Sequence, residues 1–293
     1  MNHPAPTAAA PNFAATPARD SSIGGLLLES GKITPENAER VLRMQKELGI
    51  RFGEAAQRLG LITEADIQQV LARQFDYPYL QRGESKFSQE LIAAYQPFSA
   101  QVEMLRAIRS QLMLRWFARG RKALVVASVN QDDGAALFAA NLAVVFSQLG
   151  ERTLLVDADL RQPSLQETFA LAGRQGLSDV LAGRAGLDAI ARIESFVALS
   201  VLGAGTQPPN PQELLSRSTF SALNDQLAEQ QDVVLYTVPS FGAGSDVMAV
   251  AARAGGVLLV ARKNHTSLDD IAVFSDQLER NGVEIVGSVL NDF

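Results

Sequence analysis

The sequence predicts a doubly wound α/β domain with a mostly parallel sheet, preceded by a small all-helical domain. From residue 120 onward, runs of Val, Leu and Ile alternate with helical stretches, as expected where both faces of a parallel sheet are covered. One of these runs leads through a short polar turn with Gly134 into an apolar helix, which is the layout of a phosphate-binding loop. An internal repeat within residues 22–80 predicts the helical domain.

The elements expected in the α/β domain are short and alternate along the chain. The candidate strands are Ala123–Ser128, Thr153–Val156, Leu199–Leu202, Val233–Val238, Gly256–Ala261 and Glu284–Leu290. The candidate helices between them are 135–149, 163–170, 211–229, 245–253 and 267–281. Alternation of this kind indicates a sheet with helices on both faces.

Composition limits the classes of function. The 293 residues suffice for two domains, and the net charge of −6 argues against a non-specific nucleic-acid binder. The chain has no cysteine and only two histidines, His3 and His265, so we expect a reducing cytoplasm and no metal site of Cys or His ligands. The longest apolar run falls short of the ~20 residues that a membrane helix needs. We therefore expect a cytoplasmic protein that reaches a membrane only through a partner.

Four segments are expected. Residues 1–20 are rich in Ala, Pro and Thr, which is typical of a disordered tail. Residues 21–80 form the helical repeat domain, residues 81–98 are a polar stretch without periodicity that we interpret as a linker, and residues 99–293 form the α/β domain.

The repeat aligns residues 22–45 with residues 51–74, at an offset of 29. In each copy a short helix is expected to end at a glycine, Gly31 or Gly60, because glycine is favoured after the last turn. Thr34 or Thr63 is then expected to cap a second, longer helix.

This pattern resembles the MshE-type N-terminal domain of type II secretion and pilus ATPases, in which tandem 24-residue motifs bind cyclic di-GMP. The resemblance implies that the candidate ligand residues are Gly24, Gln45, Arg51, Gly53, Leu71 and Gln74. Ser22 stands where the first motif has a guanine-stacking Arg, and Ser supplies neither stacking nor bidentate hydrogen bonds. A helical docking module whose glycines only set turns is the alternative.

The expected phosphate loop is chemically incomplete. A working loop ends in Gly-Lys-Ser/Thr, because backbone N–H groups hold phosphates, the Lys reaches the β/γ oxygens and the hydroxyl binds Mg²⁺. In the loop that begins at Ser128, Ala135 and Ala136 follow Gly134 at those two positions. Asp132 adds a negative charge, and two unit charges a few ångströms apart near a surface repel by roughly 3–4 kcal/mol before screening.

Two carboxylates follow the strand at 153–156. Asp157 and Asp159 are alternate residues and are expected to project to the same side, an arrangement that suits Mg²⁺ ligation or activation of a hydroxyl. The alternative is structural, with the carboxylates capping the strand end and pairing with Arg161.

An amphipathic helix is expected from Ser99 to Leu112, with Ser99 as its N-cap. Glu103, Arg106 and Arg109 recur every three residues, so they lie along one flank where they can pair with each other.

From about Ser99 to its end, the chain resembles the cytoplasmic domain of bacterial tyrosine kinases of capsule and exopolysaccharide export, in the MinD/ParA-like branch of P-loop proteins. Residues 141–161 are similar to the family's second Walker motif, residues 202–216 to another of its conserved stretches, and Glu103-x-x-Arg106-x-x-Arg109 to its oligomerisation motif. The resemblance implies an integral-membrane polysaccharide co-polymerase as partner. The implied site residues are Ser128, Gly134, Ala135, Ala136 and Arg161 for the nucleotide and Asp157 and Asp159 for catalysis.

The departures from the family pattern concern its chemistry. Besides the loop, Tyr236 stands where the acidic residue of the third motif is expected, and the family's Tyr-rich tail is missing before Phe293. We therefore expect no ATP, Mg²⁺ or other metal at the site. The favoured hypothesis is a pseudokinase-like regulator or scaffold that responds to cyclic di-GMP and forms homo- or hetero-oligomers with kinase-like subunits. The alternatives are an active ATP-dependent tyrosine kinase, with Asp157 as base and Asp159 on Mg²⁺, and a ParA/MinD-like positioning protein.

Overall fold

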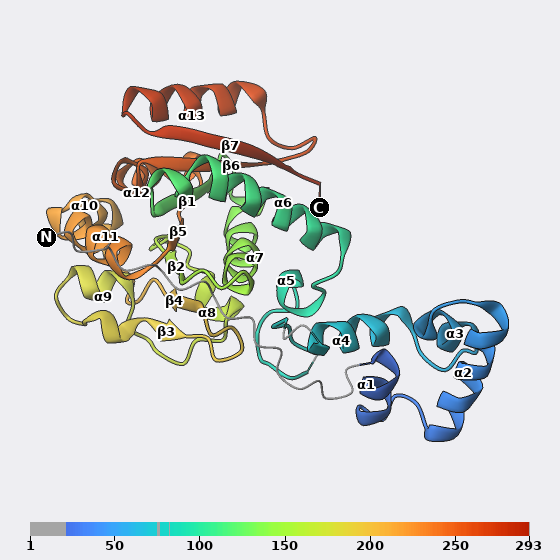
Figure 1. The fold of residues 1–293 in the computed structure, drawn as a ribbon. Helices are drawn as coiled ribbons and strands as arrows, with labels where there is room; N and C mark the ends of the chain where they lie inside the picture. Colours follow the sequence, from blue (N-terminus) through green and yellow to red (C-terminus); the bar gives the residue numbers. More distant parts are fainter. Residues whose placement is uncertain (1–21, 75–76, 82, 293) are drawn as a thin grey trace, which may run out of the picture. The chain divides into compact units, whose positions relative to one another are not determined.

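The computed structural model describes residues 22–74, 77–81 and 83–292, and for Arg73 and Gln74 it describes the backbone alone. The chain divides into two compact units, the first ending at Tyr77 and the second beginning at Pro78 (Figure 1). The tail expected at residues 1–20 lies outside the described residues.

The first unit is helical and has the expected repeat. Its helices are α1 (Ile23–Glu29), α2 (Pro35–Leu48), α3 (Phe52–Arg58) and α4 (Glu64–Gln74). The bounds of α1 and α3 differ by the offset of the repeat, and Gly31 and Gly60 after them share a left-handed backbone with φ of 67° and 66°. Glycine adopts this conformation without steric cost, which explains its place in both copies. The core of the unit is apolar and includes Leu27, Val41 and Val70.

The second unit contains a seven-stranded sheet in the order β3-β4-β2-β5-β1-β6-β7. The strands are β1 (Ala123–Ser128), β2 (Thr153–Asp157), β3 (Ala191–Arg192), β4 (Leu199–Leu202), β5 (Val233–Thr237), β6 (Gly256–Arg262) and β7 (Glu284–Asn291). Each neighbouring pair is parallel except β3 and β4, which are antiparallel. The predicted α/β fold is confirmed, and the two-residue β3 is an addition to it.

The helices of the second unit are α5 (Ile92–Tyr95), α6 (Ala100–Arg115), α7 (Ala135–Gln148), α8 (Leu165–Thr168), α9 (Leu177–Leu181), α10 (Pro211–Ser216), α11 (Ser218–Gln230), α12 (Asp246–Ala254) and α13 (Leu268–Arg280). The single helix predicted over 211–229 is wrong, because the extended backbone of Arg217 separates α10 from α11. Among the described helices, none combines the length and the apolar character needed to cross a bilayer.

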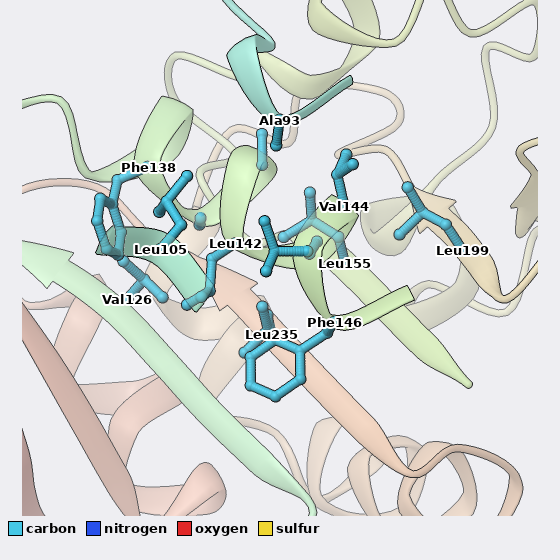
Figure 2. Close-up of a cluster of buried hydrophobic side chains, with 14 of the residues drawn as sticks. Ala93, Leu105, Val126, Phe138, Leu142, Val144, Phe146, Leu155, Leu199 and Leu235 are labelled. Atoms are coloured by element: carbon cyan, nitrogen blue, oxygen red, sulfur yellow. The ribbon is translucent and has the colours of Figure 1, made fainter. Parts of the chain in front are cut away.

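Two apolar layers sandwich the sheet. On one face α5, α6 and α7 pack against it, and Figure 2 shows Leu142 and Phe146 of α7 among Val126, Leu155 and Leu235 of the strands. On the other face α9 to α13 enclose a second layer. Both faces of the central strands are covered, which accounts for their continuous apolar runs: β1, β2 and β5 are buried at every residue.

The segment 81–98 differs from the linker we expected, because its second half is packed within the second unit. Leu91, Ala93 and Ala94 are fully buried around α5. The buried Asn141 of α7 accepts a hydrogen bond from the Ala93 backbone N–H (2.9 Å) and donates to the Glu90 carbonyl (3.1 Å). Since a buried amide needs partners, α5 and α7 satisfy each other's polar groups.

Helix α6 follows the prediction closely. Ser99 caps it by accepting a hydrogen bond from the Val102 backbone N–H (3.4 Å). Val102, Leu105 and Leu112 are buried, as the amphipathic pattern requires.

Candidate functional site

The loop between β1 and α7 lies at the carboxyl end of the sheet, where parallel α/β folds bind ligands. The Ser128 hydroxyl donates to the Asn130 carbonyl (2.8 Å), and Gln131–Asp133 forms one 3₁₀ turn. Gly134 has φ of 80°, a left-handed conformation that favours glycine, and it is the N-cap of α7. Ala135 and Ala136 occupy the first turn of α7 and carry only methyl groups.

Asp157, at the end of β2, is 1% exposed and accepts hydrogen bonds throughout its carboxylate. The backbone N–H groups of Ser164 and Leu165 both donate at 3.0 Å, and the Thr237 hydroxyl donates at 3.1 Å. Desolvation by burial outweighs these hydrogen bonds and raises the pKa of Asp157 to about 6. A general base near neutrality would have such a pKa, but this carboxylate is shut away from solvent.

Asp159 and Arg161 have structural partners of their own. The Asp159 carboxylate accepts from the backbone N–H groups of Arg161 (3.1 Å) and Gln162 (2.9 Å) and so fixes the turn after β2. The Arg161 guanidinium binds the fully buried Asp246 of α12 at 2.6 and 3.2 Å. The expectation that the Arg161 side chain pairs with Asp157 and Asp159 is therefore wrong, because its guanidinium pairs with Asp246 instead.

The protonation of Asp157 predicts a pH dependence of stability. Its folded pKa lies near 6 and its ordinary pKa is 3.8, so between these values the folded chain binds more protons than the unfolded chain. Its contribution to the free energy of unfolding should therefore fall by on the order of 2 kcal/mol as the pH rises from about 4 to about 7. Urea titrations across this range should show the fall as a difference between the unmodified chain and Asp157→Asn.

The matched control is Asp188→Asn, because Asp188 is exposed. This variant makes the same chemical change at a side chain that solvent reaches, and so measures the effect of the substitution itself. A difference for Asp157→Asn that grows with pH would mean that the folded pKa is depressed and would contradict the prediction.

The register of β5 decides which of its residues lies beside Asp157. Thr237, not Tyr236, pairs with Asp157 across the β2–β5 ladder and donates to it. Successive side chains of a strand point to opposite faces, so Tyr236 faces the other layer, where its hydroxyl donates to Asn224 (2.9 Å). Burial raises the pKa of the Tyr236 phenol well above its usual range. The residue beside the carboxylate is thus a threonine.

The residues at this edge do not fit a Mg²⁺-nucleotide. Ala135 and Ala136 supply neither the ammonium nor the hydroxyl, and neither Tyr236 nor Thr237 supplies a carboxylate at the end of β5. Asp132 brings negative charge to the loop, and Arg161 is neutralised by Asp246. The backbone frame of the loop remains, without the side chains that would hold phosphate and metal.

The three residues of the expected oligomerisation motif make contacts within their own unit. Arg106 pairs with Glu103, as expected, and also donates to the Pro97 carbonyl (2.6 Å). Arg109 reaches α7 and donates to the Val145 carbonyl (2.9 Å). Glu103 is the member of the motif that is exposed to solvent.

In the helical unit, the glycines of the repeat are positions of close packing. A Cβ at Gly24 would lie 3.2 Å from the Phe52 ring, and one at Gly53 would lie 3.0 Å from Ile67. The Arg51 side chain is exposed at the N-terminus of α3. Ser22, its counterpart in the first copy, instead caps α1 by accepting from the Gly25 N–H (3.2 Å).

The remaining candidates of the helical unit lie on its longer helices. Gln45 on α2 and Leu71 on α4 are partly buried, and the side chain of Gln74 lies outside the described atoms.

The fold is shared with P-loop proteins of the MinD type. MinD of Pyrococcus horikoshii, whose structure was solved with Mg-ADP, has 25% identity and a TM-score of 0.52 over 58% of this chain and 70% of that chain. The mostly parallel sheet, the loop after β1 and the helices on both faces define this class of protein. A scan against protein-family models finds no match.

Relatives then narrow the class to a family. The tyrosine-protein kinase YwqD of Bacillus subtilis is 31% identical over 207 residues, which span 71% of this chain and 87% of YwqD. The kinase domain of the Escherichia coli tyrosine kinase ETK has 30% identity and a TM-score of 0.68 over 74% of this chain and 85% of that domain. The chain belongs to the bacterial tyrosine-kinase family.

Other relatives are matched over a smaller part of their length. EpsB of Ralstonia nicotianae is 34% identical over 206 residues, which make up 70% of this chain and 27% of EpsB. The chain therefore spans only about a quarter of the length of EpsB.

Proposed function

We propose that this chain is a pseudokinase of the bacterial tyrosine-kinase family, which regulates or scaffolds exopolysaccharide chain-length control and export. It acts in the cytoplasm in oligomers with kinase-like subunits and with an integral-membrane polysaccharide co-polymerase. In this role the α/β unit contributes its shape and contacts, while phosphoryl transfer belongs to another subunit.

The observation that carries the proposal is the chemistry at the carboxyl edge of the sheet. Methyl groups stand at the positions where the resemblance places the lysine and the hydroxyl of the loop, and Tyr236 stands where it places the third acidic residue. The residue beside Asp157 is Thr237, which is not acidic either. Phosphoryl transfer depends on charged groups held around the phosphates and the metal ion. A domain that lacks these groups can keep the fold but cannot catalyse the reaction.

Calorimetric titration of the full-length chain with ATP·Mg²⁺, together with an assay of ATP turnover, tests the proposal. We expect neither micromolar binding nor turnover, while YwqD assayed in parallel serves as the positive control. Micromolar binding with turnover that disappears in Asp157→Asn would establish the active-kinase alternative and overturn the proposal.

We further propose that the helical unit binds cyclic di-GMP, the ligand of the MshE-type motifs it resembles. The support is the repeated pair of helices with Arg51 exposed at the start of α3. Titration with cyclic di-GMP should show binding that Arg51→Ala abolishes, because Ala can neither stack on guanine nor donate to it.

The matched control for this titration is Arg58→Ala. Arg58 is an exposed arginine on the same helix and is paired with Glu54 at 2.8 Å. Equal loss of binding in both variants would mean that the ligand responds only to the overall positive charge of the unit. If the unmodified chain does not bind cyclic di-GMP, the proposal is wrong and the alternative of a helical docking module is favoured.

A further inference from the structure

Asp133 is a carboxylate inside the loop whose side chain is fully buried. One carboxylate oxygen accepts from the Asn130 backbone N–H (2.9 Å). The other accepts from the Thr266 hydroxyl (2.8 Å) and lies 3.2 Å from Nδ1 of His265. An ionised carboxylate only accepts, so the Nδ1 of His265 carries the proton of that contact.

The partners of Asp133 come from a distant turn. Thr266 and His265 lie between β6 and α13, more than 130 residues along the chain from Asp133. The Thr266 hydroxyl also accepts from the Arg262 backbone N–H (2.7 Å), which fixes its own orientation. The Arg262 side chain reaches the Asp132 carbonyl (3.5 Å), so the turn grips the loop at two successive residues.

Other contacts of the loop are weaker or lie nearer its ends. The Asn291 amide of β7 donates to the Asp133 carbonyl at 3.5 Å. The Gly242 N–H donates to the Val129 carbonyl (3.0 Å), before the 3₁₀ turn. The Gln131 amide contacts the exposed Gln162 side chain. Asp133 alone among these residues places a fully buried charge at the centre of the loop, and hydrogen bonds to charged groups are worth about twice neutral ones.

We propose that Asp133, with Thr266 and His265, is an internal latch that keeps the loop folded in place of a bound phosphate. In a nucleotide-binding loop the ligand's oxygens order the backbone N–H groups, whereas here a carboxylate of the loop accepts from Asn130 and anchors the loop to the β6–α13 turn. With the latch in place, the loop stays ordered without a bound ligand. The latch also connects the loop to the outer part of the sheet at β6 and β7. This inference concerns how the loop is held, and it stands whether or not the site turns over ATP.

Amide hydrogen exchange of the full-length chain without ligand tests the latch. Thr266→Val preserves the shape of the side chain and removes its hydroxyl, which leaves the buried carboxylate short of a donor. Exchange across residues 129–136 should become at least about tenfold faster, because the lost hydrogen bond is one to a charged group and is worth more than a typical net hydrogen bond.

Thr153→Val is the matched control. Thr153 is buried at the start of β2, at the opposite end of the sheet, and its hydroxyl donates to Glu151 (2.8 Å). This variant should leave exchange across residues 129–136 unchanged.

Asp133→Asn provides a second variant that retains the size of the side chain and removes its charge. It should also accelerate exchange across the loop, while the amides of β2 stay as slow as in the unmodified chain. Unchanged loop exchange in both Thr266→Val and Asp133→Asn would overturn the latch. ATP turnover, measured separately, bears on the pseudokinase proposal and not on this result.

Discussion

Rebuilding the loop with Asp132→Gly, Ala135→Lys and Ala136→Thr together should raise the affinity for ATP·Mg²⁺ at least about a hundredfold over the unmodified chain. The change removes a negative charge and adds a positive one beside the phosphates. Each charge at a few ångströms is worth roughly 3–4 kcal/mol near a surface, and a hundredfold gain needs only about 2.7 kcal/mol after screening. Because the frame of β1, the loop and α7 is in place, the new side chains enter an existing fold. Calorimetry on both chains measures the gain.

A charge-matched control separates site chemistry from net charge. Ala118→Lys with Glu229→Ala makes the same change in net charge at two exposed positions, which precede β1 and β5 at the opposite edge of the sheet from the loop. This variant should bind ATP·Mg²⁺ no better than the unmodified chain. If the rebuilt loop also failed to increase the affinity for ATP·Mg²⁺, the backbone conformation of the loop, and not the absence of the lysine and hydroxyl, would be what excludes nucleotide.

The fold could be predicted because its pattern is local. Apolar strands covered on both faces read as continuous runs, and their bounds fall within a residue or so of the expected ones. The repeat was visible because glycine and threonine mark helix ends by local backbone preferences, which the structure reproduces at Gly31 and Gly60. The two residues of β3 were too few to give any pattern.

The site could be predicted only in part, because its details depend on register and on distant contacts. A strand's alternation separates Tyr236 from Thr237, but only the pairing with β2 identifies the one beside Asp157. The sequence shows Asp133 only as one acidic residue of a polar turn. Its partners His265 and Thr266 could not be predicted without the sheet order, which places β6 beside β1. The same holds for the pairing of Arg161 with Asp246 across 85 residues.

The second large effect is expected at Gly176, where Ala should lower the free energy of unfolding by more than about 3 kcal/mol, above the usual cost of overpacking. A Cβ there would lie 2.1 Å from the Gly203 carbonyl oxygen and 2.4 Å from the Gly205 nitrogen. Both obstacles are backbone atoms, so no rotamer change relieves the clash. Since φ of Gly176 is −162°, an extended value open to any residue, the penalty is purely one of space.

Urea unfolding followed by the fluorescence of Trp116 measures this loss, because the chain's one tryptophan is buried in the second unit. Gly173→Ala is the control, since a Cβ at Gly173 meets nothing within 4 Å. A loss below about 1 kcal/mol would mean that the 203–205 backbone moves aside at little cost. A large loss would show that the start of α9 and the 202–216 stretch resembling the kinases are held together by direct backbone contact. Because that contact is one of backbone packing, the proposed pseudokinase would depend on it as strictly as an active kinase would.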